Sequence, residues 1–205
     1  MADRKHGAPA PPTTGTVRAA EWRAAELHGE RFDQVLFVDV DMMELVDDGA
    51  VFTECTFRGV RFNASVHRDA AFTNCTFVRC SFFDAAFTRC KFVGSMFDSC
   101  SWGAVMVEGG DWSFAGLPGA DLRGCTLRGV RMREADLTGA LLGKAEMTGC
   151  DLSAAWLHSA DLTECDLRYS NLDGLDPLTT KLNKAVIDPD QAAVIATALG
   201  LHVLP

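Results

Sequence analysis

The residues with the richest chemistry in this sequence are eight cysteines, which lie at positions 55, 75, 80, 90, 100, 125, 150 and 165. Cysteine thiolates bind zinc or carry out dithiol redox chemistry when two of them are closely spaced, as in C-x-x-C. No two of these cysteines have that spacing, and all of them fall on multiples of five. The pattern predicts buried structural thiols, and we expect no metal and no cofactor.

Asp47 and His67 also suggest chemistry, because each interrupts a regular series of apolar positions. His67 is open to three interpretations: a buried switch, a hydrogen-bonded core histidine or a local bulge. At Asp47, which is followed by Asp48 and Gly49, we expect a corner where the chain is displaced outward. The sequence contains no nucleophile elbow, phosphate-binding loop, dinucleotide fingerprint or zinc-protease motif, which predicts a protein that is not an enzyme.

The elements that position these residues follow a repeat of five. Every fifth residue from Trp22 to Leu182 is apolar in thirty of thirty-three cases, and the exceptions are Asp47, His67 and Pro177. Small residues such as Ala, Cys, Val and Ser lie two positions before most of them. Neither a helix nor a long flat strand has this period. Eleven glycines share one phase of the repeat, which is typical of a corner that disfavours a Cβ atom.

Four such corners close a square coil of twenty residues. Stacked coils form a solenoid, in which each coil is stabilised by its neighbours. Residues twenty apart then lie in one column, so Cys55 over Cys75 and Cys80 over Cys100 come within the distance that a disulfide spans. In a reducing cytoplasm we expect these thiols to be free.

Three segments match the consensus of the pentapeptide-repeat family: Ala120-Asp121-Leu122, Ala135-Asp136-Leu137 and Ala160-Asp161-Leu162. Residues 52–60 and 71–77, with the ending 186–193 and 199–203, are similar to the MfpA and Qnr members of that family. The resemblance implies an all-β fold, a right-handed quadrilateral parallel β-helix with a short C-terminal α-helix. It also implies a mimic of duplex DNA that binds DNA gyrase or topoisomerase IV, modulates or inhibits it, and protects it from quinolones or other poisons.

Two functions therefore make different use of the surface. DNA mimicry would use acidic residues at one phase of the repeat, namely Asp111, Asp121, Asp136, Asp151, Asp161 and Asp166. The alternative, a cytosolic interaction scaffold for another protein such as a small GTPase, would use an outward apolar row on one face, namely Leu36, Val38, Val78, Met96 and Trp156. The net charge of −9 argues against direct binding of nucleic acid.

The repeat divides the chain into three segments. We expect a disordered tail over residues 1–17, the β-helix over 18–184, and a C-terminal helix and dimerisation segment over 185–205. Asp188, Pro189, Gln191 and Gly200 are the start and stop signals of a helix over 189–199. The resemblance implies a homodimer of two rods joined end to end, for which we expect contacts from Val194, Ile195, Ala198, Leu199, Leu201 and Val203. The sequence has no run of eighteen apolar residues, so we expect no membrane contact and a cytoplasmic location.

Overall fold

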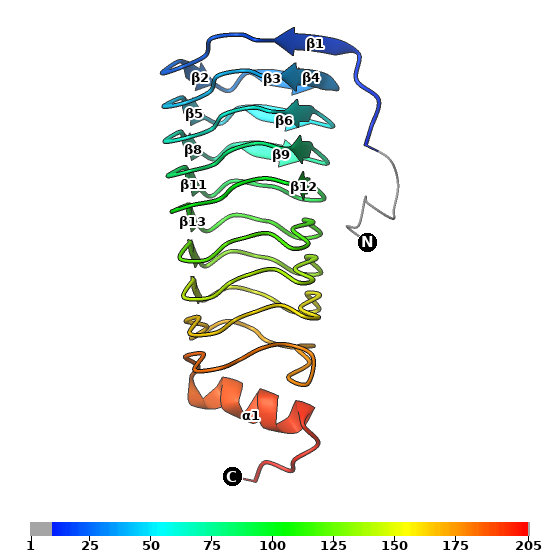
Figure 1. Ribbon diagram of the computed structural model, residues 1–205, viewed down its shortest axis with the longest axis vertical. Coiled ribbons are helices and arrows are strands. Elements are labelled where there is room, and N and C mark those ends of the chain that lie inside the picture. The colour runs from blue at the N-terminus through cyan, green and yellow to red at the C-terminus, as the bar shows by residue number, and fades with distance from the viewer. Residues whose placement is uncertain (1–9, 205) are drawn as a thin grey trace.

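The computed structural model describes residues 10–204, and these form a rod of stacked coils that ends in one helix (Figure 1). The helix α1 spans Pro189–Ala198. The strands of the described residues are short, with the following bounds: β1 Gly15–Arg18, β2 Glu26–His28, β3 Arg31–Asp33, β4 Val35–Val38, β5 Val46–Asp48, β6 Val51–Thr53, β7 Thr56–Arg58, β8 Val66–Arg68, β9 Ala71–Thr73, β10 Thr76–Val78, β11 Ala86–Thr88, β12 Met96–Asp98, β13 Met106–Glu108, β14 Thr126–Arg128 and β15 Glu146–Thr148.

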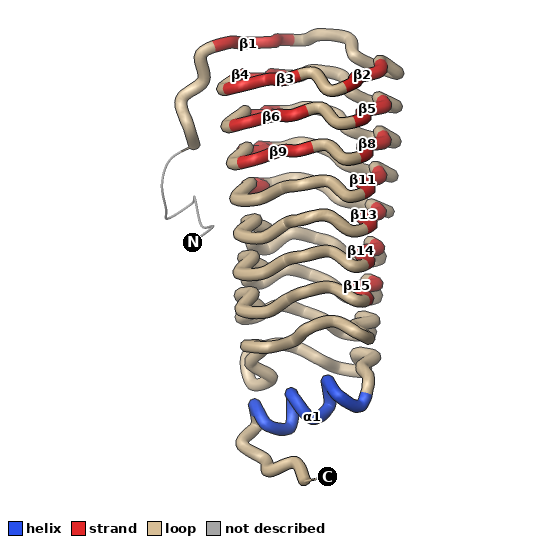
Figure 2. The backbone as a smooth tube through the Cα atoms, turned by 180° about the vertical axis from the view of Figure 1, so that it is seen from behind, coloured by secondary structure: helices blue, strands red, loops and turns tan. Residues whose placement is uncertain are grey.

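The coil has four sides, as the repeat predicts. The first side is a ladder of single parallel bridges that runs from Glu21 to Ser101 and again from Asp121 to Lys181, with no bridge between Ser101 and Asp121. The second is the seven-stranded sheet β2-β5-β8-β11-β13-β14-β15, which Figure 2 shows along one edge of the rod. The third begins with the sheet β3-β6-β9, and the fourth with the sheet β1-β4-β7-β10-β12.

All pairing is parallel and joins residues twenty apart, from Gly15 with Val35 to Asp166 with Val186. This register confirms the coil of twenty residues. It also corrects the expected N-terminal boundary, because the β-helix begins at Gly15 and residues 15–17 belong to β1 rather than to a tail. Residues 1–9 of the expected tail lie outside the described part of the chain.

The inward residues stack in columns. On the fourth side the rings of Phe37, Phe57, Phe77 and Phe97 follow one another with centroids 4.7–4.8 Å apart. This distance equals the spacing of about 4.8 Å between strands, so each ring packs flat on the next without bending the backbone. Leucine and methionine take over the columns in the C-terminal half and are equally buried.

The corners of the coils share one backbone conformation, whether or not the corner residue is glycine. The corner phase has a positive φ in coil after coil, at Gly119 (φ 66°) and equally at Glu134 (φ 53°) and Lys144 (φ 59°). Side chains with a Cβ adopt this conformation at a cost of roughly 1–2 kcal/mol per residue. Glycine therefore marks the corners correctly, although most corners are formed by other residues.

The cysteines have a structural role that their spacing did not reveal. Seven are buried and Cys100 is half-buried, and all eight are free thiols. Each of seven thiols donates to the carbonyl of the inward residue 23 positions earlier, as Cys75 does to Phe52 at 3.3 Å and Cys90 to His67 at 3.4 Å. The hydroxyl of Ser170 makes the same bond to Met147 at 2.6 Å. These side chains supply the corner carbonyls with a donor inside the core.

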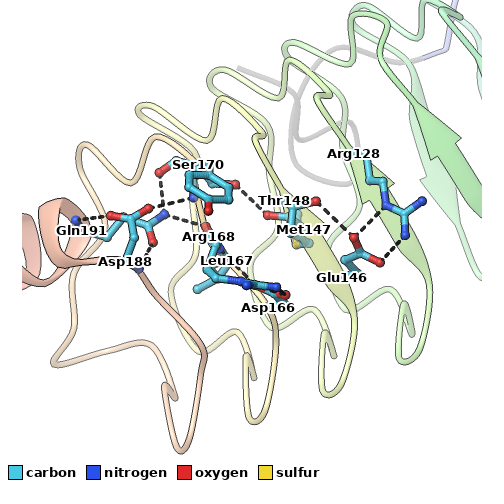
Figure 3. Close-up of polar contacts among 11 residues, drawn as sticks. Arg128, Glu146, Met147, Thr148, Asp166, Leu167, Arg168, Ser170, Asp188 and Gln191 are labelled. Atoms are coloured by element: carbon cyan, nitrogen blue, oxygen red, sulfur yellow. Dashed lines mark hydrogen bonds and ion pairs between the residues drawn. The ribbon is translucent and has the colours of Figure 1, made fainter.

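The helix α1 closes the C-terminal end of the rod. The carboxylate of Asp188 accepts from the backbone N–H of Gln191 at 3.0 Å, and the side-chain oxygen of Gln191 accepts from the N–H of Asp188 at 2.9 Å, which is a complete capping box (Figure 3). The side-chain amide of Gln191 also donates to the carbonyls of Leu167 and Ser170 in the preceding coil. The expected helix is thus confirmed. No helix within residues 10–204 is long and apolar enough to cross a membrane.

Candidate functional site

The six aspartates expected to form an acidic surface do not lie together. Asp121 and Asp161 belong to the first side, Asp166 to the second, Asp111 and Asp151 to the third, and Asp136 to the fourth. Five of them are at least partly exposed, whereas Asp136 is buried, with 5% of its surface accessible. One partner is therefore unable to contact all six from one direction.

Each of these aspartates also has a local structural role. One carboxylate oxygen accepts from the backbone N–H two residues later, as in Asp136 with Thr138 at 2.9 Å and Asp161 with Thr163 at 3.0 Å. The same bond occurs at the other four, at distances of 3.0–3.3 Å. Short acidic side chains favour such turns because they supply an acceptor that the backbone lacks at a corner. The repeated aspartate is thus explained by the turn alone.

Basic neighbours neutralise much of this charge. Asp121 pairs with Arg123 at 2.6 Å and Asp166 with Arg168 at 2.7 Å. In both pairs the hydrogen bonds from the guanidinium lower the pKa of the carboxyl group. Three further pairs follow the columns or their diagonals: Asp111 with Arg131, Asp151 with Arg133, and Asp161 with Lys181. These carboxylates present weaker fields to a partner than their number suggests.

The expected apolar row on the fourth side is wrong as an exposed surface. Val38 and Met96 each have only 6% of their surface accessible. Leu36 and Val78 are half-buried, and Trp156, 45% exposed, is the one residue of the five that is open to solvent. The column of Val38 and Val78 is interleaved with Arg58, so the apolar side chains are separated by a charged one.

Asp47 and His67 are neither bulges nor corners. Asp47 lies in β5 and His67 in β8, in register and facing inward, with 0% and 1% of their surfaces accessible. Nδ1 of His67 is 2.9 Å from Oδ2 of Asp47, and Nε2 is 3.0 Å from Oγ of Ser65. Oδ1 of Asp47 accepts from the N–H of Ala50 at 2.9 Å. The expectation of an outward corner at Asp47 is therefore corrected, because these partners satisfy its carboxylate inside the core.

Ser65, His67 and Asp47 are hydrogen-bonded to one another in the arrangement of a hydrolase triad, but their surroundings prevent that chemistry. Ser65 is fully buried, and its hydroxyl donates to the carbonyl of Phe62 at 2.7 Å. The oxygen of Ser65 therefore accepts from Nε2 of His67. Nδ1 of His67 lies 2.9 Å from Oδ2 of Asp47, so the two side chains form a buried, hydrogen-bonded ion pair. No substrate reaches the hydroxyl, and its proton is already committed.

The described residues show no cluster that suits a metal. No group of three or more His, Cys, Asp or Glu side chains converges in residues 10–204. A shallow groove of about 840 Å³ lies on the first side, where Gly103, Gly124 and Gly143 leave the surface low. Its polar lining includes the paired Asp121 and Arg123, so it does not present a free coordinating group.

Comparison with known proteins matches this architecture to a repeat family. The family model described as pentapeptide repeats matches residues 113–143 and 145–176 in eight copies. Residues 113–143 and 145–176 therefore consist of pentapeptide repeats. The twenty-residue register continues on both sides of these segments, so the rest of the rod resembles the same family in its architecture.

The chain is also similar to MfpA and Qnr proteins. It is 41% identical to MfpA of Mycobacterium tuberculosis over 59 residues, which are 29% of this chain and 30% of that protein. It is 46% identical to MfpA of Mycolicibacterium smegmatis over 43 residues, or 21% and 22% of the two chains. The matches thus span less than a third of the length of these curated relatives. A structure of trypsin-treated QnrB1, a plasmid-mediated fluoroquinolone resistance protein, superposes with a TM-score of 0.64 and 21% identity over 93% of this chain and 100% of that one.

The pentapeptide-repeat rod ends in an apolar segment with few contacts of its own. Of the residues expected at a dimer interface, Ile195 packs on the core and Val194 is half-buried. Ala198 and the following residues project from the end of the rod, and Leu199, Leu201 and Val203 are 47%, 60% and 50% exposed. The C-terminal end is therefore divided into a cap, which seals the last coil, and an exposed apolar tail.

Proposed function

We propose that this protein is a non-enzymatic, cytoplasmic DNA mimic that binds DNA gyrase or topoisomerase IV and modulates or inhibits it. Protection from quinolones or other topoisomerase poisons would be a second outcome of the same binding. The observation that carries the proposal is the uninterrupted rod, shared over nearly its full length with a fluoroquinolone resistance protein, together with the local similarity to MfpA.

The two ends of the rod are acidic, whereas its middle is basic. Residues 134–190 contain eleven acidic and four basic residues, a net charge of −7, whereas residues 55–133 contain six acidic and ten basic residues, a net charge of +4. An enzyme surface that holds the phosphates of DNA is basic and attracts acidic groups. Residues 10–54 contain ten acidic and three basic residues, also a net charge of −7, so both ends of the rod, and not the central coils, resemble DNA in the sign of their charge. We place the contact at the C-terminal end because the proposed dimer would join two acidic zones there.

We also propose that two rods join through the tail formed by Leu199, Leu201 and Val203. This apolar tail projects into solvent, and such exposed apolar segments mark interaction sites. A homodimer joined at this end would bring the two acidic C-terminal zones next to each other. It would double the length of acidic surface that gyrase meets.

The test is gyrase supercoiling titrated with purified protein, with and without a fluoroquinolone. Inhibition or protection is expected, and it should weaken in the variant Glu134→Lys/Asp173→Lys, which reverses two exposed charges in the C-terminal zone. The matched control Glu21→Lys/Asp33→Lys makes the same change of charge at the N-terminal end and should leave the effect intact. No effect of the parent protein on its host's gyrase would refute the proposal.

Dimerisation is tested separately by Leu201→Asp/Val203→Asp, which spares every contact between α1 and the last coil. Sedimentation should show a monomer with an unchanged circular dichroism spectrum. A variant that remains dimeric would contradict the proposed interface. Deletion of residues 188–205 is the harsher comparison, because it also removes the cap.

A further inference from the structure

The outer face of the seven-stranded sheet carries an apolar column. Val46, Val66, Ala86 and Met106 lie in consecutive coils, in register, on strands β5, β8, β11 and β13. Figures 1 and 2 both show these strands stacked directly above one another. With about 4.8 Å between strands, the four side chains form a strip about 14 Å long.

The strip is exposed at Met106 and partly covered at its other three residues. Val46, Val66 and Ala86 are half-buried by their neighbours in the column, and Met106 is 53% exposed. Glu26 precedes the strip, and Thr126 follows it. The apolar character is thus confined to the middle coils and ends in polar residues at both ends. We refer to Val46, Val66, Ala86 and Met106 as the β5–β13 strip.

Acidic side chains flank the β5–β13 strip on both edges. Glu44 and Asp84 are exposed at the corner before it, and Asp48 and Glu108 are exposed on the strand residues after it. None of these four carboxylates has an ion pair within 4.0 Å among residues 10–204. Arg68 and Arg128 lie in the same column as Asp48 and Glu108, so this edge carries both signs of charge. The edge formed by Glu44 and Asp84 is the acidic one, although the central coils as a whole carry a positive net charge.

We propose that the β5–β13 strip is a docking surface for a basic amphipathic helix of a partner protein. A helix rises 1.5 Å per residue, so apolar side chains at i, i+4, i+7 and i+11 span roughly 16 Å and match the strip. Lysine and arginine along one side of that apolar stripe would then meet the acidic edge formed by Glu44 and Asp84. The surface lies away from the acidic C-terminal coils, so this inference goes beyond the proposed contact with gyrase and does not depend on it.

The column also stabilises the sheet, since β-branched neighbours on adjacent strands pack against each other. That role alone would not require the flanking carboxylates. The two roles also make different predictions, because packing within the column is unaffected by a soluble helix. Binding of such a helix is the observation that separates them.

The experiment uses the full chain and a synthetic eighteen-residue peptide of leucine and lysine with its leucines at helical spacing, beside a scrambled peptide of equal composition. Fluorescence anisotropy should show binding of the helical peptide and about tenfold weaker binding to Met106→Glu, since a buried apolar contact is lost. The added negative charge would by itself strengthen binding of a basic peptide, so a loss identifies the apolar contact. Leu178→Glu, at a residue 79% exposed on the fourth side, adds the same charge as a matched control and should bind at least as tightly as the parent.

Chemical-shift mapping should place the peptide on β5, β8, β11 and β13, and Asp84→Lys/Glu108→Lys should reduce both the affinity and its salt dependence. Met106→Gln serves as a neutral second variant if Met106→Glu lowers the melting temperature. Equal binding of the scrambled peptide, equal behaviour of Met106→Glu and Leu178→Glu, or shifts spread over all four sides would overturn the proposal. A change of oligomeric state in Met106→Glu would also overturn it, because the strip would then be a contact between two copies of the chain. Binding to anionic phospholipid vesicles instead of the peptide, equal for the parent and Met106→Glu, would overturn it as well.

Discussion

The buried pair of Asp47 and His67 offers a quantitative test of how this core is stabilised. The variant His67→Phe leaves the Asp47 carboxylate without its cation, and Asp47→Leu leaves the imidazole without its acceptor. Both groups are inaccessible to water. Removing one partner of a buried ion pair costs about 3–5 kcal/mol, because the other charge stays in the core uncompensated. Each single variant should therefore lose that much stability.

The double variant Asp47→Leu/His67→Phe should behave differently. It restores the apolar repeat, places a phenylalanine on Phe87, where the imidazole now stacks with centroids 4.9 Å apart, and removes both charges. Replacing a buried ion pair by apolar residues is worth about 1–4 kcal/mol. The N–H of Ala50 loses its acceptor, which costs about 1–3 kcal/mol. We expect the double variant to lie within about 2 kcal/mol of the parent.

The assay is urea unfolding of the four proteins at one fixed concentration, since association contributes to apparent stability. We expect a coupling free energy between Asp47 and His67 that nearly cancels the losses of stability in the two single variants. Additive losses, with the double variant destabilised by about 6–10 kcal/mol, would refute it. That result would mean that the site requires polar residues for its shape, independent of the pairing of charge.

Three further predictions follow from the corners, the thiols and the cap. Gly110→Ala should prevent folding of the central coils, since a Cβ atom there would overlap the carbonyl of Cys90. At Gly119 a Cβ atom would meet no other atom within 4 Å, so Gly119→Ala should lower the free energy of unfolding by only about 1–2 kcal/mol in the same urea assay. Burial raises the pKa of Cys90 to about 12 and that of Cys150 to about 11. Mass spectrometry should therefore show that iodoacetamide at pH 8 labels these two thiols only after unfolding. Rapid labelling of the native protein would contradict their burial. Hydrogen bonds from backbone N–H groups lower the pKa of Asp188 in the folded state. The stability that Asp188 adds to the helix cap is therefore present above its unfolded pKa and is lost as the pH falls through its folded pKa. Hydrogen exchange of the helix amides should accelerate below about pH 4 in the parent and show no such step in Asp188→Asn.

The period of five was sufficient to predict the coil, the inward residues and the helix cap, because these depend on local spacing alone. The same repeat places Asp47 and His67 twenty residues apart and therefore in one column, which is the signal for their contact. Considering each residue separately does not predict that contact. Exposure was harder to predict, since an outward side chain is covered by the residues above and below it. Val38 lies between Arg18 and Arg58 in its column, and the repeat cannot tell how far their side chains cover it.

The aspartates show a different limit. Their recurrence at one phase predicts a shared cause, and the structure identifies that cause as the turn, with the backbone N–H two residues later as the partner. A surface role needs a shared direction, which five-residue spacing does not provide. Successive repeats face four different ways, so only spacing by twenty gathers side chains on one side.

That geometry also governs how a chain of this kind changes length. An insertion or deletion of five residues leaves every inward residue inward, and the core continues to pack. It nevertheless turns everything downstream by a quarter revolution about the rod axis relative to everything upstream. The β5–β13 strip would be divided between two adjacent sides by such a change between β8 and β11, with no loss of apolar contact inside. Only a gain or loss of a whole coil of twenty residues preserves both the fold and the alignment of its outer surfaces. A change of five residues therefore alters which outward side chains lie on one side, although the core tolerates it.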